Sequence, residues 1–135
     1  LSSNARILRV YRQKRAWVES QSTWNDYATG AGWQTAGGFG ANDCEQTSIG
    51  DVSISASQTV NVGVDISLTA SAIQEIVNGT WTNNGFLLKV DTESNDYFDY
   101  GSRENATEAY RPKLVIEYTL PQSGGKPIFA NFGIV

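Results

Sequence analysis

Six stretches of the chain have apolar side chains that alternate with polar ones or form short runs, the two patterns typical of β-strands. The clearest alternation has valine or isoleucine at every second position from Val60 to Ile66. The six predicted strands are residues 5–12, 48–57, 58–66, 86–90, 97–100 and 113–120. The regular structure of the chain is therefore expected to be mainly β-strand.

One segment, residues 69–77, changes to a helical period. Its apolar positions at i, i+3 and i+4 are Ile73, Ile76 and Val77. A side-chain oxygen of Thr69 or Ser71 can cap the first turn, and Gly79 stands where a left-handed residue commonly ends a helix. The pattern predicts one short helix and no other.

Short strands around a single helix predict an all-β fold, an antiparallel β-sandwich of the jelly-roll type. The chain of 135 residues has the length of one domain. We assign residues 1–120 to this domain, residues 121–127 (PQSGGKP) to a flexible linker and residues 128–135 (IFANFGIV) to an apolar C-terminal arm. The glycine-rich residues 25–43 form a long loop, and long loops often carry function.

Composition excludes several classes of chemistry. The chain has no His and a single Cys, which removes His-dependent catalytic triads, disulfide frameworks and Cys/His zinc sites. The acidic neighbours Asp43 and Glu45 disfavour a reactive thiolate at Cys44. A net charge of −4 argues against nucleic-acid binding, and no apolar run is long enough for membrane insertion. We therefore expect a protein that is not an enzyme.

Charge is unevenly distributed along the chain. The first fifteen residues hold five bases and no acid, whereas residues 16–88 hold seven acids and no base. This asymmetry suits contacts between subunits, for which Arg6, Arg9 and Arg12 are the candidates. An equally good explanation is a basic edge strand whose charges discourage strand pairing.

The C-terminal arm supplies a second set of candidate subunit contacts: Ile128, Phe129, Phe132 and Ile134. So many large apolar side chains are costly to leave in water, at about 1.5–3 kcal/mol each. The preferred prediction is that the arm pairs with the sheet edge of a neighbouring copy or another protein. The alternative is that it folds back on its own domain.

Aromatic residues in the long loop suggest a glycan-binding site, because flat rings stack on the apolar faces of sugars. Trp33 is the main candidate, with Tyr27 and Phe39 nearby in the sequence. For Trp33 itself, packing of the loop against the domain is slightly favoured over ligand binding. Trp17 and Trp24 lie in strand-like sequence and are expected in the core.

Four acids in nine residues form the weak metal candidate: Asp91, Glu93, Asp96 and Asp99. Carboxylates of this kind can bind Ca²⁺, although their spacing differs from that of an EF-hand loop. A solvated hairpin turn is the favoured explanation, and no other cofactor is expected. A glycosidase pair needs a second, pKa-raised carboxyl group, for which the sequence gives no sign.

Residues 64–118 resemble the DNRLRE-domain family of jelly-roll modules. The segments that carry the resemblance are VDISLTASAIQEIVNGTWTNNGFLLK, YGSRE and RPKLVIEY, together with the upstream WVESQSTWNDYATGAGWQTAGG. The family normally has further strands before the one that corresponds to residues 7–11. The resemblance implies a module of secreted proteins or of phage particles, and for some members binding of acidic polysaccharides such as alginate.

Two functions follow as expectations. The preferred one is a structural module on a virus particle, such as a capsid decoration or fibre domain, held by contacts with copies of itself or with other virion proteins. The missing leading strands, opposed charges and apolar arm all favour contacts between chains. The alternative is an extracellular carbohydrate-binding module that recognises a polysaccharide through the long loop.

Overall fold

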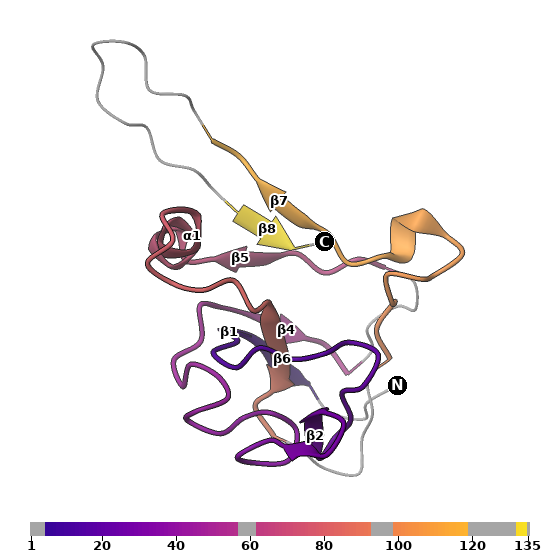
Figure 1. Ribbon diagram of the computed structural model, residues 1–135. Coiled ribbons are helices and arrows are strands. Elements are labelled where there is room, and N and C mark those ends of the chain that lie inside the picture. The colour runs from indigo at the N-terminus through magenta and orange to yellow at the C-terminus, as the bar shows by residue number, and fades with distance from the viewer. Residues whose placement is uncertain (1–4, 57–61, 93–98, 119–131, 135) are drawn as a thin grey trace, which may run out of the picture.

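The computed structural model describes residues 5–56, 62–92, 99–118 and the backbone of 132–134 (Figure 1). The strands are β1 (Arg6–Arg12), β2 (Asp26–Ala28), β3 (Ala31–Gly32), β4 (Gly50–Ile54), β5 (Ile66–Leu68), β6 (Phe86–Val90), β7 (Leu114–Ile116) and β8 (Phe132–Ile134). The α-helix is α1 (Ala70–Val77), and a 3₁₀ turn covers Glu108–Tyr110. The predicted β-rich, antiparallel fold with one short α-helix is confirmed, while its jelly-roll form stays a prediction.

The described strands form three antiparallel sheets. One has the order β4-β1-β6, a second pairs β2 with β3, and the third has the order β5-β8-β7. In the first sheet Leu8 of β1 lies opposite Val52 of β4 and Val90 of β6. Figure 1 shows the third sheet and α1 on one side of the molecule and the first sheet on the other.

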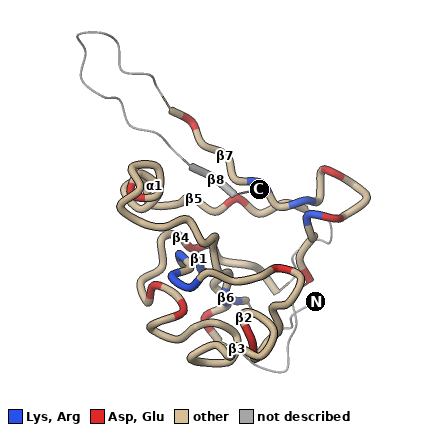
Figure 2. The backbone as a smooth tube through the Cα atoms, viewed as in Figure 1, with Lys and Arg blue, Asp and Glu red and all other residues tan. Residues whose placement is uncertain are grey.

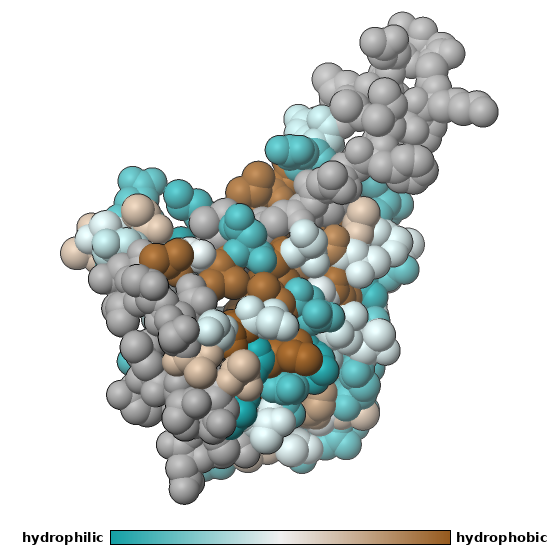
Figure 3. Space-filling model, turned by 180° about the vertical axis from the view of Figure 1, so that it is seen from behind, coloured by the Kyte–Doolittle hydropathy of each residue, from teal (hydrophilic) through white to brown (hydrophobic). Residues whose placement is uncertain are grey.

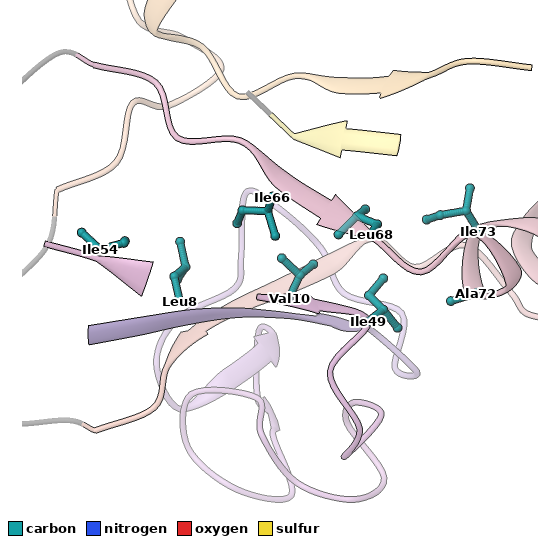
Figure 4. Close-up of a cluster of buried hydrophobic side chains, with 8 residues drawn as sticks. All are labelled: Leu8, Val10, Ile49, Ile54, Ile66, Leu68, Ala72 and Ile73. Atoms are coloured by element: carbon teal, nitrogen blue, oxygen red, sulfur yellow. The ribbon is translucent and has the colours of Figure 1, made fainter. Parts of the chain in front are cut away.

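The hydrophobic core lies between these two layers (Figure 4). Its buried members are Leu8, Val10, Ile49, Ile54, Ile66, Leu68, Ala72 and Ile73. Leu8 and Val10 reach the core from one face of β1 because side chains two apart on a strand share a face. β5 and the first turns of α1 supply the opposite side, so burial of these residues joins the layers.

The backbones of β4 and β5 lie very close together at Gly50. A Cβ on Gly50 would lie 2.5 Å from the carbonyl oxygen of Ser67, so a side chain there would force the two segments apart. The backbone N–H of Thr69 donates to the carbonyl of Ile49 at 2.6 Å. These contacts fix the start of α1 next to the first sheet.

Helix α1 begins and ends close to the predicted positions. Gly79 has φ +75°, the left-handed conformation expected after the helix. Thr69 is the N-cap residue, but its side chain makes no capping hydrogen bond. The predicted capping oxygen is therefore wrong, and the helix depends instead on the burial of Ala72 and Ile73.

Several predicted strands differ from the observed ones. Residues 58–61 lie outside the described residues. Among the described residues 62–66, only Ile66 lies in a strand, and Val62 is exposed. Residues 99 and 100 are not in a strand, and 97 and 98 are outside the description. An alternating pattern indicates that a segment can form a strand, but it forms one only where a neighbouring strand is available to pair with it.

Candidate functional site: a glycine-rich loop with an exposed tryptophan

Residues 23–43, which we call the aromatic loop, fold around the short β2–β3 hairpin. The side-chain hydroxyl of Thr23 accepts hydrogen bonds from the backbone N–H groups of Asn25 and Asp26, at 3.2 and 3.0 Å. The N–H of Trp33 donates to the carbonyl of Asn25 at 2.9 Å. These bonds give a compact turn to a segment whose glycines would otherwise leave it free.

A buried ion pair anchors the end of the aromatic loop. The carboxylate of Asp43 is fully buried and accepts from the Arg15 guanidinium at 2.6 Å and from the Thr35 N–H at 3.1 Å. The hydrogen bond to Asp43 raises the pKa of Arg15 above its usual value. Because a buried charge without partners is costly, this arrangement ties the loop firmly to the segment after β1.

Trp33 holds the middle of the loop. Its indole N–H donates to the carbonyl of Thr23 at 3.1 Å, and its ring meets that of Tyr27 edge to face at 5.7 Å between centroids. The ring also lies over Gly38, where an added Cβ would be 3.5 Å away. The indole N–H and the ring of Trp33 thus have neighbours within the loop, and the residue is half-buried.

Trp24 is in a different position. Its side chain is 64% exposed, although its six-membered ring lies against the backbone of Gly37. An added Cβ on Gly37 would come within 2.6 Å of the ring, and the Gly37 N–H donates to the Trp24 carbonyl at 2.7 Å. Trp24 and Gly37 together form what we call the tryptophan platform, an indole supported by backbone and open to solvent.

The expected core positions of Trp17 and Trp24 are therefore wrong. Trp17 is also exposed, and its indole N–H donates to the carbonyl of Asn84 at 2.9 Å. Residues 17–24 contain a turn at 19–21 and are otherwise irregular, so the alternating pattern there does not mark a buried face. Each of these side chains reaches the surface because its own backbone is on the surface.

The structure brings together two of the three predicted glycan residues, Trp33 and Tyr27. Phe39 instead contacts the ring of Tyr11 at 4.9 Å and lies under the Lys89 ammonium group. Sequence reasoning missed Trp24, the most exposed ring of the aromatic loop. Its signal was the pair of adjacent glycines at 37 and 38, which let backbone approach both indoles closely.

Two of the four acids in the metal candidate lie in the described part of the chain. The Asp91 carboxylate accepts from the backbone N–H groups of Ile7 and Thr92, at 3.0 and 2.9 Å. The bond from Ile7 is the main cause that lowers the pKa of Asp91. Glu93 and Asp96 lie outside the described residues. Among the described residues, no three or more His, Cys, Asp or Glu side chains form a group that could hold a metal ion, so Asp99 belongs to no such group. The Ca²⁺ site stays a prediction.

The three candidate arginines of β1 have different environments. Arg12, expected at a subunit contact, is buried inside its own chain, which corrects that prediction. Its guanidinium binds Glu45 and Glu75 at 2.8 and 2.6 Å and lies 3.9 Å from the Trp81 ring centre. Arg6 and Arg9 are half-buried, and their role in subunit contact stays a prediction.

The C-terminal candidates are also divided. Ile128 and Phe129 lie outside the described residues. Phe132 and Ile134 belong to β8, which pairs antiparallel with both β5 and β7 of the same chain. Residues 132–134 therefore fold back on their own domain, which was the alternative prediction, and do not extend to a neighbouring copy.

The described residues offer little nucleophilic chemistry. Burial raises the pKa of the Cys44 thiol to about 11, so the thiolate is scarce near neutral pH. Desolvation also raises the pKa of Tyr100. In the described part of the chain, no helix has the length and apolarity needed to cross a membrane.

Comparison with known families gives one match. The model of the family described as "Disaggregatase related repeat domain" matches residues 2–116. No match was found among curated proteins or solved structures. The suggested DNRLRE resemblance is wrong, because the matching family is a different one. The chain belongs to the disaggregatase-related repeat domain family.

Proposed function

From this family membership and the geometry of the aromatic loop, we propose that the chain is a non-enzymatic repeat module that binds a polysaccharide outside the cell. The tryptophan platform is the observation that carries the proposal. An exposed indole can stack on the apolar C–H face of a sugar ring, and its flat surface offers a large contact area. Such aromatic anchors commonly contribute most of the energy of a binding site.

The support beneath the platform strengthens the proposal. Gly37 contacts one part of the indole, and the Asp43–Arg15 ion pair fixes the loop that contains Gly37. A preordered ring loses little conformational freedom on binding, so more of the stacking energy remains as affinity. Exposure by itself does not make Trp24 a binding residue. Its contact with Gly37 and the fixed position of the loop distinguish it from other exposed side chains.

Charge favours a neutral glycan over an acidic one. The aromatic loop contains Asp26 and Asp43 and no basic residue. Figure 2 shows the basic positions gathered along β1, β6 and the segment before β7. Lys14 and Arg15, the nearest bases in sequence, are engaged by the Ala41 carbonyl and the Asp43 carboxylate. A polyanion such as alginate would therefore find little compensation here.

The family description fits a binding role. A repeat that binds weakly gains strength when several copies engage one polymer, because each further contact is effectively intramolecular. In this proposal the chain itself carries out no catalytic step. The virion-surface role stays a prediction. Of its three supports, the missing leading strands came from the DNRLRE resemblance that the family match overturns, whereas the opposed charges and the apolar arm came from the sequence itself.

The test is isothermal titration calorimetry of the chain with a panel of soluble polysaccharides, both neutral (dextran, laminarin) and acidic (alginate). Trp24→Ala should weaken binding of the preferred glycan about 5- to 150-fold, the loss expected for an aromatic anchor. Trp17→Ala is the matched control, because Trp17 is exposed but lies outside the aromatic loop. It should leave binding unchanged.

Two results would count against polysaccharide binding at the tryptophan platform. One is equal loss of binding in both variants, which would place the contact elsewhere or make it nonspecific. The other is absence of binding to every glycan of the panel. Release of sugar products by the unmodified chain would contradict the non-enzymatic part.

A further inference from the structure

The outer edge of β7 has no strand beside it in the described part of the chain. β7 stands at one end of the sheet β5-β8-β7, with β8 on its inner side. In an antiparallel strand, alternate residues direct both their N–H and C=O groups to the same side. The outer edge of β7 therefore holds main-chain donors and acceptors that β8 does not use.

The side chains of β7 are apolar and open to solvent. Leu114 and Ile116 lie in the same cross-strand rows, through β8, as Ile66 and Leu68 of β5. Residues in such rows point to the same face of a sheet, here the face toward the core. Yet Leu114 and Ile116 are 45% and 42% exposed, against 2% and 7% for Ile66 and Leu68. Val115, on the other face, is exposed as well.

Natural sheets rarely leave such an edge open, because an apolar edge strand is a template for pairing with another chain. Figure 3 shows hydrophobic surface open to solvent on the rear side of the molecule. The residues next to the apolar triplet are the basic Lys113 and the acidic Glu117, both exposed. Neither makes an ion pair with another described residue.

These charges are arranged symmetrically about Val115. If two copies of β7 pair antiparallel with Val115 opposite Val115, Lys113 of each copy lies opposite Glu117 of the other. Leu114 then lies opposite Ile116, so apolar residues meet apolar residues. Registers that place Lys113 opposite Lys113, or Glu117 opposite Glu117, bring like charges together and are disfavoured.

We propose that β7 is an interface between two copies of this domain, which pair antiparallel through residues 113–117 with Val115 at the centre. We assign a second copy as the partner because the charge order of this segment, with Lys113 at one end and Glu117 at the other, complements itself in an antiparallel pairing. The family match supports this choice, since it describes the domain as a repeat and ends at Ile116, the last residue of β7. The proposal is independent of polysaccharide binding.

The expected association is weak. Two short strands bury a small area, and small interfaces give transient complexes. Within a protein that contains several repeats, a flexible connection would raise the effective concentration of one β7 near another to about the millimolar range. That concentration is enough for an interface with a weak dissociation constant to form. The interface therefore suits neighbouring repeats better than free domains.

The experiment is sedimentation velocity of the full chain over a range of concentrations, at low salt. The unmodified chain should show a concentration-dependent dimer. Lys113→Glu should weaken dimerisation about tenfold, because two attractive pairs become repulsive, and Glu117→Lys should do the same. The double variant K113E/E117K exchanges both charges and should recover the original dimer.

Mixing the two single variants gives a second, independent arm. Each variant alone repels its own copies, but the mixture restores two opposite-charge pairs and should form a heterodimer. Circular dichroism of each variant checks the fold, which exposed charge changes should leave intact. High salt should reduce the differences among all variants, because exposed charges are screened.

Three outcomes would overturn the proposal. The first is an unmodified chain that remains monomeric at every concentration. The second is dimerisation that is equal in the original chain and both single variants, which would place the contact on another surface. The third is failure of both the double variant and the mixture to recover the dimer.

Discussion

The outer strands of the sheet β5-β8-β7 have similar sequences and very different surroundings. Ile66 and Leu68 of β5 are buried beneath β1, β4 and α1, whereas Leu114 and Ile116 of β7 are half exposed in the same rows of the sheet. Strand pairing alone therefore does not bury a side chain. A second layer must cover it, and in this chain that layer ends before it reaches β7.

The largest expected effect comes from truncating the covered strand. Ile66→Ala should lower the free energy of unfolding by about 2–5 kcal/mol, because it leaves a cavity in a packed core. Leu114→Ala should cost less than about 1.5 kcal/mol, because much of that side chain is already in water. Urea denaturation followed by circular dichroism measures both.

An equal loss in the two variants would contradict the comparison for the isolated chain. Repeating the measurement on diluted protein separates two causes. A cost at Leu114 that disappears on dilution would come from cover by a second copy, whereas a cost that persists would come from cover within the chain.

The same contrast can be tested in the aromatic loop. Trp33→Ala should lower stability by about 1–3 kcal/mol, since it removes a hydrogen bond to Thr23 and the contacts with Tyr27 and Gly38. Trp24→Ala should cost less than about 1 kcal/mol while it weakens glycan binding. Thermal unfolding and titration of the two variants measure these separate effects. A Trp24 variant that loses stability without losing affinity would assign the platform to packing.

Cys44 provides a reporter of core opening. Its thiol is fully buried, and burial raises its pKa to about 11, so alkylation of the native protein should be slow. Ile66→Ala should accelerate labelling at least about tenfold, because labelling follows the population of opened molecules. Leu114→Ala should change the rate little. Mass spectrometry over time measures both rates, and a similar acceleration in the two variants would contradict the difference in cover.

The same thiol gives a pH dependence. Its pKa is about 11 in the folded protein and has its ordinary value of 9.0 when exposed, so rising pH ionises the unfolded chain first. This contribution to stability is therefore complete below pH 9 and is lost as the pH rises toward 11. Denaturation across that range should show a smaller decline for Cys44→Ala than for the original chain. Equal declines would mean that the thiol is not protected in the folded state.

The smallest expected effect is at Val115, which lies on the outward face of β7. Val115→Thr keeps the branched shape suited to a strand and should change the stability of the monomer by no more than about 0.5 kcal/mol. Denaturation of dilute protein measures it. A substantially larger loss would show that this face of β7 is covered within the chain.

Local patterns predicted several elements well. Residues 86–90 are the observed bounds of β6, and residues 5–12 contain β1. The helical period of residues 69–77 and the position of Gly79 located α1 and its end. These features depend on side chains close together in the sequence, where helical and strand periods and backbone preferences are visible directly.

The site was harder to predict because exposure depends on distant residues. The sequence placed Trp24 in a strand-like stretch and Trp33 in the glycine-rich loop, and so made Trp33 the better of the two candidates for ligand binding. Hydrogen bonds and ring contacts with Thr23 and Tyr27 draw Trp33 into the loop, while Gly37 supports Trp24 from one side only. Likewise, the sequence suggested that the basic Arg12 lies on the surface. Its partners Glu45 and Glu75 are far away in the sequence, so only the structure shows that they pair with its buried side chain.

By itself, the sequence determined the β-rich class, the helix, the lack of His-based chemistry and the absence of a disulfide framework, because these depend on composition and on neighbouring residues. Only the tertiary structure decided which apolar residues are covered. Val62 and Ile66 lie in one alternating pattern, yet Val62 is exposed and Ile66 is buried. The physical reason is that burial needs a second surface, and that surface comes from parts of the chain far away in the sequence.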